Sequence, residues 1–521
     1  MKTIKEIKPQ YRNLLFVCGF LITDKKLANT AEFPFYGTWS ETQMGNYYVY
    51  CHPRTKFTFV EKDGKQFFLA GKVMNPFTGE YEEEKILDKI SDNYGKNSYR
   101  SCVDELSGVF VYGVANGGKV EYEVDPSGMQ SAFYGTVDGV FYLTSHVQIV
   151  ADLCGLKMTD FAKRLINYKW YNRVMGPYFP ADITQYAEML RVVPNIAYNY
   201  DGKAVTHKRF YPLKDLPEVK NDKEYNEVIE KAADILKNTM ALVPKKWNNP
   251  KISLTGGIDS NTTFASANGN YDKFEAFSYI SAPKEVPDTE AAKKIAAKFN
   301  MKHTTYQIPD ENSKVEDFDD IAAVIKHNNG YMGNEKDNEL RKRAYLLKNL
   351  DADVEVKSWV SETIRCYWYK HYGRTKFPKM SPKLFRNLYK IFIWNRPLAH
   401  KIDKIFAKYI KDFEYDKIPA QYPIADMHFN EVTWGSWGGF NISEMKIYTD
   451  ITFVYNNRKF LDLLFRVPLD KRISDQHHLD MKKYLNKELF DMGIRVINLK
   501  ETDTRARLLN MMFTVNSWLP F

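Results

Sequence analysis

Cysteine is scarce in this sequence. Its 521 residues contain five cysteines that lie far apart, and no two of them form a C-x-x-C pair. Disulfide frameworks and zinc sites need cysteines in pairs or at short, regular spacing. We therefore predict neither, and we expect a reducing, cytoplasmic environment for the cysteines, which are Cys18, Cys51, Cys102, Cys154 and Cys366.

Long apolar runs are also missing. The run at residues 14–22 follows several lysines and so imitates a secretion signal, but Glu6 interrupts the basic region and no small-residue cleavage site follows. No other run approaches the length needed to cross a bilayer. We expect residues 14–22 to form a core strand, and we expect neither export nor a membrane partner.

Composition and charge are those of a folded protein with anionic partners. Hydrophobic residues make up 44% and charged residues 27% of the chain, which is ordinary for a folded protein. A length of 521 residues exceeds what one core organises and predicts at least two domains. The formal charge of +9 favours nucleotides or acidic substrates without choosing between them.

The hydrophobic pattern changes near residue 214. Before it, short alternating runs separated by Gly, Asn and Asp are typical of antiparallel strands, with a helical pattern from Val147 to Tyr171. After it, strands alternate with helices as in a parallel sheet, and the C-terminal part is mainly helical. The sequence predicts an α+β antiparallel sandwich over residues 1–213 and an α/β parallel-sheet domain over residues 214–521.

A short loop with the sequence TGGIDS lies between a predicted strand and a helix predicted to begin near Asn261. Glycine lets the backbone approach an anion closely, and a helix N-terminus offers free N–H groups and partial positive charge. We predict that this loop is a cradle for pyrophosphate; an ordinary glycine-rich turn is the alternative. The predicted binding residues are Thr255, Gly256, Gly257, Asp259 and Ser260.

This loop resembles the S-G-G-x-D-S signature of the N-type ATP pyrophosphatases, with Thr255 keeping the hydroxyl of the usual serine. The resemblance implies that ATP is cleaved between its α and β phosphates. It also implies that Asp259 helps to hold Mg²⁺ and pyrophosphate, whose charge the cation neutralises. ATP and Mg²⁺ are therefore the expected cofactors.

A looser resemblance to asparagine synthetases extends over most of the chain. FEAFSYI resembles the family's adenine-contacting strand, and PDTEAAKKIAAKFNMKHTTYQI resembles its D-E-x-x-x-A segment. NLKETDTR is similar to the stretch with the active-site lysine, which implies that Lys500 is catalytic; a solvated surface lysine is the alternative. Such a lysine would stabilise the negative charge that develops during the reaction.

The S-G-x-G-A-D-E segment of the same family is degraded here. The corresponding stretch, VEVKSWVSETIRCYWY, keeps only Ser358, Ser361 and Glu362 as possible counterparts. Glu362 is a candidate catalytic residue that orients the substrate or acts as a base; an ion pair with Arg365 is the alternative. This departure puts the family's usual substrate, an amino acid, in doubt.

The N-terminal part resembles the class II glutamine amidotransferase domain of asparagine synthetases, which has an Ntn-hydrolase fold. LSGVFVYGV, EYEVDPSGMQSAFYG and GVFYLTSHVQIVADL follow the order of strands in that domain. Its catalysis needs an N-terminal cysteine whose α-amino group is the base. Here Lys2 occupies the second position and the C-G-I motif is the internal Cys18-Gly19-Phe20, which only removal of the preceding residues would expose.

A second feature of this domain also differs. Where the resemblance calls for N-G-E-I-Y-N, the chain has Ala70-Gly71-Lys72-Val73-Met74-Asn75. Lys72 would repel the ammonium end of glutamine. We expect a degenerate, structural amidotransferase-like domain, so that nitrogen comes from ammonia or an amine.

Three further features receive structural interpretations. The adjacent His477 and His478 point to different faces of a helix with no third ligand in sight, so no metal site is expected there. The basic, aromatic residues 371–401 are typical of an amphipathic helix, with polyanion or nucleic-acid binding as the alternative. WGSWGGFN is expected to be turn-rich, with Trp434 and Trp437 in the core.

Together these observations predict an asparagine synthetase-like ligase that adenylates a carboxylate, aspartate or another acid, and then transfers ammonia or an amine to it. An intramolecular cyclase of the β-lactam synthetase or lasso-peptide cyclase type is one alternative. A non-catalytic ATP-binding scaffold is another. The expected partners are small molecules and not nucleic acid; whether the chain forms a homodimer stays open.

Overall fold

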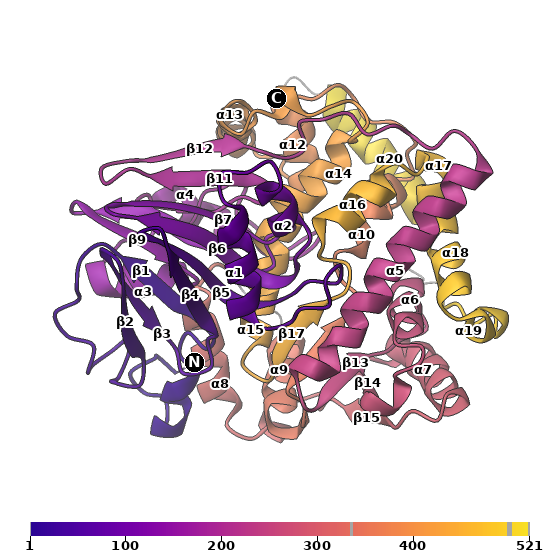
Figure 1. Ribbon diagram of the computed structural model, residues 1–521, viewed down its shortest axis with the longest axis horizontal. Coiled ribbons are helices and arrows are strands. Elements are labelled where there is room, and N and C mark those ends of the chain that lie inside the picture. The colour runs from indigo at the N-terminus through magenta and orange to yellow at the C-terminus, as the bar shows by residue number, and fades with distance from the viewer. Residues whose placement is uncertain (1, 334–336, 497–502, 519–521) are drawn as a thin grey trace.

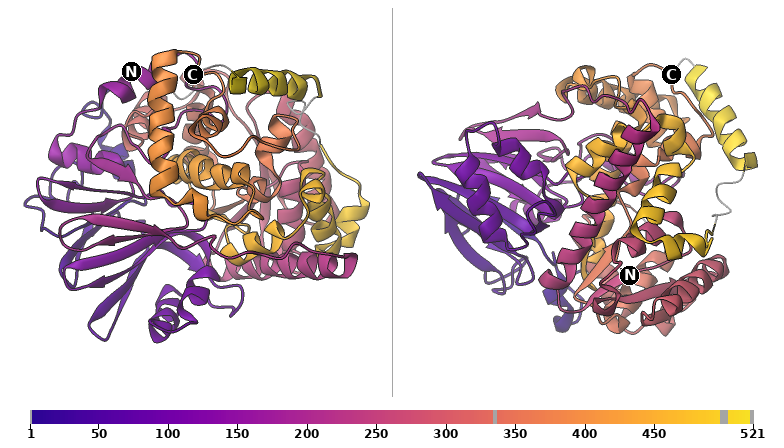
Figure 2. Two further views of the ribbon diagram at one scale, coloured as in Figure 1. Left: turned by 90° about the horizontal axis from the view of Figure 1, so that it is seen from above. Right: turned by 45° about the vertical axis from the view of Figure 1, so that its right-hand side comes forward.

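The computed structural model describes residues 2–333, 337–496 and 503–518. A strand-rich region and a helix-rich region lie side by side in it, as Figures 1 and 2 show. Within the described residues, no helix is both long and apolar enough to cross a membrane.

The strand-rich region is built from two antiparallel sheets of six strands each, in the orders β10-β8-β9-β1-β3-β2 and β12-β11-β7-β6-β5-β4. Side chains from both sheets, such as Ile22 and Val111, share one buried core. The predicted antiparallel sandwich is confirmed. Its strands are β1 (Phe20–Thr23), β2 (Ser40–Met44), β3 (Tyr47–Cys51), β4 (Phe57–Lys62), β5 (Lys65–Met74), β6 (Ser107–Asn116), β7 (Lys119–Val124), β8 (Phe133–Val137), β9 (Val140–Thr144), β10 (Met189–Arg191), β11 (Ile196–Tyr200) and β12 (Val205–Arg209).

Strand β5 illustrates how the sequence pattern produces this arrangement. Successive side chains of a strand point to opposite faces of the sheet. Phe68 therefore packs into the sandwich core, whereas Phe67 and Leu69 pack against helices on the outer face. Those helices are α1 (Glu83–Asn93) and α2 (Tyr99–Asp104).

One expectation for this region is wrong and another is refined. Residues 14–22 are not one strand: a 3₁₀ helix covers Pro9–Leu14, the chain turns through positive φ at Phe16 and Cys18, and β1 begins only at Phe20. The helical pattern after Val147 forms two helices, because the chain takes a left-handed conformation at Gly155. They are α3 (Val147–Cys154) and α4 (Asp160–Ile166).

The helix-rich region contains a five-stranded sheet in the order β15-β14-β13-β16-β17, and all its strand pairs are parallel. The predicted α/β sheet is confirmed. Strands β14 and β15 extend the sheet on one side of β13, and β16 and β17 extend it on the other. The loops after β13 and β16 therefore lead to opposite sides of the sheet. Open sheets commonly bind ligands at such a switch point. The strands are β13 (Pro250–Ser253), β14 (Glu275–Ile280), β15 (His303–Gln307), β16 (Val354–Lys357) and β17 (Asp450–Phe453).

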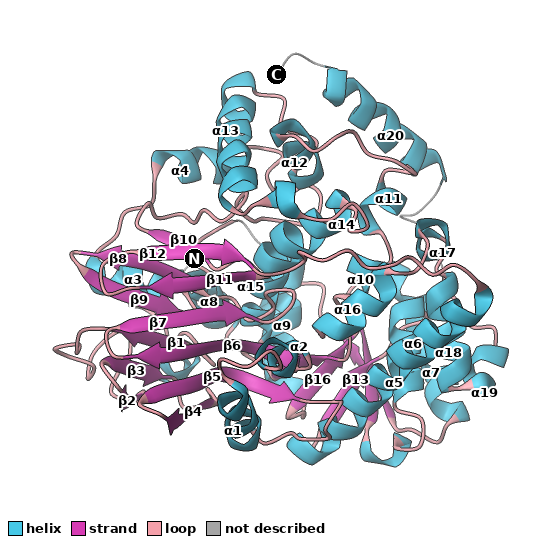
Figure 3. Cartoon of the chain, turned by 45° about the horizontal axis from the view of Figure 1, so that its top comes forward, coloured by secondary structure: helices cyan, strands magenta, loops and turns pink. Residues whose placement is uncertain are grey.

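Helices surround this sheet and form most of the C-terminal part (Figure 3), as the sequence predicts. They are α5 (Asp222–Lys246), α6 (Ile258–Ser266), α7 (Val286–Lys298), α8 (Phe318–Asn328), α9 (Asp337–Asn349), α10 (Ser361–Ile364), α11 (Tyr367–His371), α12 (Pro382–Tyr389), α13 (Arg396–Asp412), α14 (Ile424–His428), α15 (Gly439–Met445), α16 (Arg458–Phe465), α17 (Leu469–Ile473), α18 (Gln476–Leu485), α19 (Lys487–Asp491) and α20 (Asp503–Trp518).

The basic, aromatic stretch forms α12 and α13. Helix α13 is amphipathic, because Ile402 and Phe406 are buried while most of its lysines face outward. Helix α12 is buried along most of its length, and its Arg386 pairs with Asp403 of α13. The structural interpretation therefore holds for α13, and α12 belongs to the interior.

The expectation of turns in WGSWGGFN is wrong. A π-helix covers Phe429–Gly438 and continues directly into α15. The glycines allow close contact with the strand-rich region: a Cβ at Gly435 would lie 2.7 Å from Arg191 Nη1, and one at Gly439 would lie 2.4 Å from the Gly128 carbonyl oxygen. Trp434 is buried as expected, and Trp437 is partly buried.

The two regions are joined through a buried ion pair. Arg209, at the end of β12, donates from Nη1 and Nη2 to the Glu431 carboxylate at 2.7 and 2.8 Å, and both side chains are fully buried. The next regular element, α5, begins at Asp222. The predicted boundary near residue 214 falls between these two elements and stays a prediction.

Candidate nucleotide site

The loop at Thr255 to Ser260 connects β13 to α6 at the switch point of the parallel sheet. Helix α6 begins at Ile258, earlier than the expected start near Asn261, so Asp259 and Ser260 lie in its first turn. The N–H groups of a first helical turn have no partner within the helix. The first turn of α6 therefore offers backbone donors, whereas the N–H groups of Thr255, Gly256 and Gly257 bond within the protein.

Hydroxyl groups hold the loop in its shape. The N–H of Thr255 donates to Ser260 Oγ at 3.1 Å, and the two hydroxyl oxygens lie 2.9 Å apart. The N–H of Gly257 donates to Thr255 Oγ1, also at 3.1 Å. Thr255 thus supplies the local hydrogen bonds that a serine hydroxyl would supply at this position.

Gly256 is required by packing. A Cβ there would lie 2.2 Å from Val496 Cγ2 and 2.9 Å from Ala291 Cβ. Its N–H donates to Asp288 Oδ1 at 3.1 Å, and its carbonyl accepts from the N–H of Val496 at 2.9 Å. Asp288 belongs to the segment PDTEAAKK, but the sequence alone did not indicate that it would bond to the loop.

The carboxylate of Asp259 faces residues that follow β16. Ser361 Oγ donates to Asp259 Oδ1 at 2.7 Å, and Arg365 Nη1 forms an ion pair with Oδ2. His478 Nε2 lies 3.5 Å from Oδ1. The switch point therefore brings together the loop and the degraded segment, which are about 100 residues apart in the sequence.

Arg365 has a second carboxylate partner, Asp475. Its Nε and Nη2 donate to the two Asp475 oxygens at 2.8 and 2.9 Å. These cationic partners hold the pKa of Asp475 well below its usual range despite burial. In the described part of the chain, Arg365 thus pairs with Asp259 and Asp475, and the alternative of a Glu362–Arg365 ion pair is not the arrangement found.

Glu362 is a partly buried carboxyl beside this pair. Burial, together with the negative charge of Asp259, raises its pKa to about 8. Its nearest hydroxyl donor is Ser361 Oγ at 3.5 Å. A carboxyl with a pKa near neutrality is suited to exchanging a proton with a substrate.

Residues with strained backbone lie on both sides of helix α10, which carries Ser361 and Glu362. Val360, just before α10, has φ +81°, and Cys366, two residues after it, has φ +57°. A positive φ is rare for a β-branched residue, and such strain clusters at functional sites. The strain places Ser361 and Arg365 against Asp259.

A family model described as asparagine synthase matches residues 251–337, which include the loop, β14, α7 and β15. Residues 251–337 thus match an asparagine synthase domain. This match supports, in general terms, an ATP-dependent carbon–nitrogen ligase that forms amides. No curated protein sequence matches the chain.

Solved structures with weak similarity include three enzymes. The allosteric regulatory enzyme of purine biosynthesis is 10% identical over 57% of this chain and 76% of its own, with a TM-score of 0.24. Glutamine phosphoribosylpyrophosphate amidotransferase from B. subtilis is 10% identical over 68% and 73%, with a TM-score of 0.22. Glutamine-dependent NAD⁺ synthetase from Acinetobacter baumannii is 9% identical over 52% and 65%, with a TM-score of 0.20. These scores are too low to support any argument about activity.

Asp259 is the carboxylate that the sequence predicts for the magnesium site. Asp259 lies in the loop, and the described residues contain no group of three His, Cys, Asp or Glu side chains that could hold a metal ion. Magnesium in phosphate sites takes one or two carboxylates together with phosphate oxygens and water. Asp259 fits that role, provided that Arg365 releases or shares its oxygen. Lys500 lies outside the described residues.

His477 and His478 lie next to the domain's acidic residues. Both rings are buried, and burial holds their pKa values well below the usual range, so both are neutral. His478 stacks on Tyr455, whose hydroxyl donates to the Asp259 carbonyl at 3.1 Å. These histidines therefore belong to the packing around Asp259.

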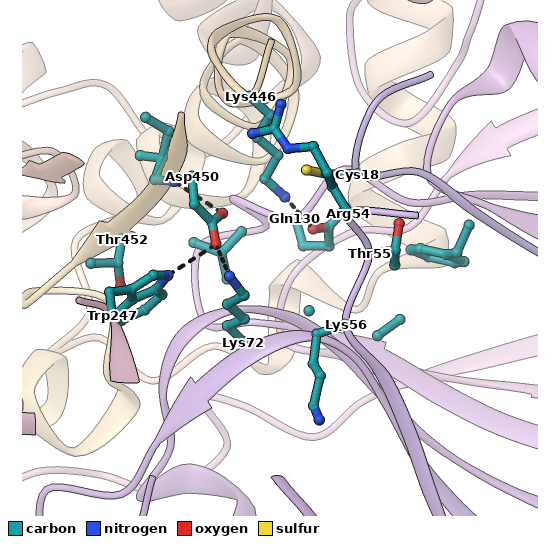
Figure 4. Close-up of a pocket in the computed structure, with 15 residues that line it drawn as sticks. Cys18, Arg54, Thr55, Lys56, Lys72, Gln130, Trp247, Lys446, Asp450 and Thr452 are labelled. Atoms are coloured by element: carbon teal, nitrogen blue, oxygen red, sulfur yellow. Dashed lines mark hydrogen bonds and ion pairs between the residues drawn. The ribbon is translucent and has the colours of Figure 1, made fainter. Parts of the chain in front are cut away.

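The surroundings of Cys18 form a second polar site between the two regions (Figure 4). Lys72 Nζ lies 2.7 Å from Asp450 Oδ2, and Lys446 Nζ donates to Gln130 Oε1 at 2.7 Å. The cavity that these residues line measures about 20 Å³, enough for one water molecule. Burial raises the pKa of the Cys18 thiol, which disfavours the thiolate form that a nucleophile needs.

The residues before Cys18 are folded against the asparagine synthase domain. The N–H of Phe16 donates to Asn328 Oδ1 at 2.8 Å, and Asn328 Nδ2 donates to the Leu14 carbonyl at 3.0 Å. Tyr11 donates its hydroxyl hydrogen to Asp317 Oδ2 at 2.7 Å. The segment before Cys18 is thus an integral part of the contact with α8.

Proposed function

We propose that the protein activates a carboxylate with ATP and converts it into an amide with ammonia or an amine. The observation that carries this proposal is the meeting of the Thr255–Ser260 loop with Ser361 and Glu362 at the sheet's switch point. The match to the asparagine synthase model supports it independently of that geometry.

The reaction has two steps. In the first, a carboxylate oxygen of the substrate attacks the α-phosphorus, the bond to the bridging oxygen breaks, and pyrophosphate leaves. In the second, the nitrogen attacks the acyl carbon, AMP leaves with the electrons of the C–O bond, and the nitrogen loses a proton. Adenylation is needed because a carboxylate is a poor electrophile.

We assign roles to the residues on that basis. The loop from Thr255 to Ser260 binds the phosphates with its hydroxyls and with the N–H groups of the first turn of α6. Bound magnesium would neutralise phosphate charge, with Asp259 as its protein ligand. Glu362, with its raised pKa, accepts the proton that the nitrogen loses. Lys500 stabilises the charge on the phosphates and on the tetrahedral intermediate.

Ammonia or an amine, rather than glutamine, is the proposed nitrogen source. Cys18 follows a folded segment, so its amide nitrogen is part of the chain and cannot act as the free amine that glutaminase chemistry needs. Lys72, which would repel the ammonium group of glutamine, lies beside the thiol in an ion pair with Asp450. The internal position of Cys18 and the presence of Lys72 both disfavour glutamine hydrolysis at this site.

The test is pyrophosphate release from magnesium-ATP against a panel of carboxylic acids, with and without ammonium. Release that depends on an acid and on ammonium is expected, and Asp259→Ala should abolish it. Asp272→Ala, an exposed aspartate in the same domain, is the matched control and should retain it. Amide formation without an added amine would instead indicate a cyclase, and ATP binding without release for any acid would indicate a scaffold.

A further inference from the structure

Three cationic side chains gather around Asp475 next to the phosphate loop. Arg365 and Lys370 both form ion pairs with Asp475, and Arg495 Nη2 lies 3.2 Å from its Oδ2. The following residue, Val496, is bonded to the loop through Gly256. The cluster therefore lies against the loop that we propose binds phosphates.

The guanidinium of Arg365 is held in a fixed orientation. Asp475, whose side chain is only 5% exposed, accepts two parallel hydrogen bonds from Nε and Nη2. The remaining nitrogen, Nη1, points to Asp259 in the loop. Two-point pairing of this kind fixes the plane of a guanidinium and suits it to bind a second oxyanion.

The two more buried cations of this cluster share their carboxylate partners. Arg365 and Lys370, whose side chains are 14% and 17% exposed, both pair with Asp475, and Arg365 also pairs with Asp259, whereas Arg495 is 42% exposed at the edge of the cluster. A largely buried cation needs an anionic partner, and an incoming oxyanion can take the place of a shared carboxylate oxygen. The loop beside it is the place where the proposed function puts such an anion.

We propose that Arg365 is a phosphate-contacting residue that binds the pyrophosphate portion of the nucleotide. This inference rests on the proposed function. When the nucleotide arrives, Nη1 exchanges the Asp259 oxygen for a phosphate oxygen, while Nε and Nη2 stay on Asp475. The exchange frees Asp259 to act as a metal ligand, and it gives the site affinity for pyrophosphate without any divalent cation.

The experiment measures binding of inorganic pyrophosphate and of ATP by calorimetry, once with EDTA and once with magnesium. The full-length chain should bind pyrophosphate in EDTA, and Arg365→Gln should weaken that binding about tenfold or more, since it removes a charged hydrogen bond. Arg365→Lys should fall between the two, because lysine lacks the planar fork. Arg100→Gln, which removes an ion-paired arginine of the strand-rich region, is the control and should bind like the unaltered chain.

Each outcome has one meaning. Equal affinity of the unaltered chain and Arg365→Gln in EDTA would overturn the inference and leave the proposed function standing. Failure of the unaltered chain to bind ATP or pyrophosphate under both conditions would overturn both. If thermal unfolding shows that Arg365→Gln does not fold, Arg365→Lys decides: weaker binding supports the inference, and unchanged binding contradicts it.

Discussion

The surroundings of Asp259 and of Cys18 are both polar, but they differ in how their cations are held. Around Asp259, Arg365 is shared between two carboxylates beside the first turn of a helix, so its Nη1 can pass from Asp259 to an incoming anion. Around Cys18, Lys72 pairs with Asp450 and Lys446 bonds to Gln130, and the cavity between them holds about one water. The first site can exchange a partner for a ligand, whereas the second has no room for one as large as glutamine.

The strand-rich and helix-rich regions therefore differ in what their structures are suited to do. The strand-rich region keeps its sandwich, its core and its contact with α8, and these depend on burial and do not require a reactive cysteine. In the helix-rich region, residues with positive φ and the ion pair of Arg365 with Asp259 lie together at the switch point of the sheet. Packing alone does not require this arrangement. Four substitutions test this contrast.

The largest effect is expected for Asp259→Asn. The change keeps the size of the side chain but removes the charge that pairs with Arg365 and that would bind magnesium. Pyrophosphate release should fall by about 100-fold or more, the usual cost of losing a charge-stabilising group at a reaction centre. Steady-state pyrophosphate assays measure it, and a loss of less than threefold would contradict the assignment of Asp259.

Glu362→Gln should change the pH dependence of stability and of turnover. The pKa of Glu362 is about 8 in the folded chain against 4.5 for the free side chain, so between these values the folded state binds a proton that the unfolded state has lost. The free energy of unfolding should therefore fall as pH rises through this window, by up to about 1.4 kcal/mol per pH unit.

Urea unfolding from about pH 5 to about pH 8 measures this slope, which should be shallower in Glu362→Gln. At a fixed concentration of free ammonia, amide formation by the unaltered chain should rise as pH increases through about 8, because the base must lose its proton first. The variant should lack that rise. Identical slopes and identical rate profiles in the two proteins would contradict the role given to Glu362.

The sequence predicted the loop because its signal is local: a strand, two glycines, an aspartate and a serine in consecutive order. The partners of Asp259 carry no such signal. Arg365 and Asp475 are far apart in the sequence and are ordinary charged residues until the fold brings them together. Glycines were equally ambiguous, since those of WGSWGGFN serve close packing against Gly128 and Arg191 and do not form turns.

A moderate effect is expected for Asn328→Ala in the contact with the segment before Cys18. It removes the partner of the Phe16 N–H and of the Leu14 carbonyl, both buried. The free energy of unfolding should fall by about 1–3 kcal/mol, the cost of leaving buried polar groups unsatisfied. Asn167→Ala, which removes an exposed hydrogen bond, is the control and should cost less. ATP affinity should not change in either variant.

The smallest effect is expected for Cys18→Ala. The thiol is buried and uncharged in the proposed account, and it takes no part in adenylation. Pyrophosphate release with ammonium should be unchanged in this variant. A loss of that activity, or a specific loss of activity with glutamine, would show that the Cys18 site is still in use.

The most direct test of the contrast between the two sites compares ammonium with glutamine as nitrogen donor, using an acid that supports pyrophosphate release. Amide product and free glutamate are both quantified by mass spectrometry. The account predicts amide with ammonium, none above background with glutamine, and no glutamate. Glutamate released in step with the amide would contradict it.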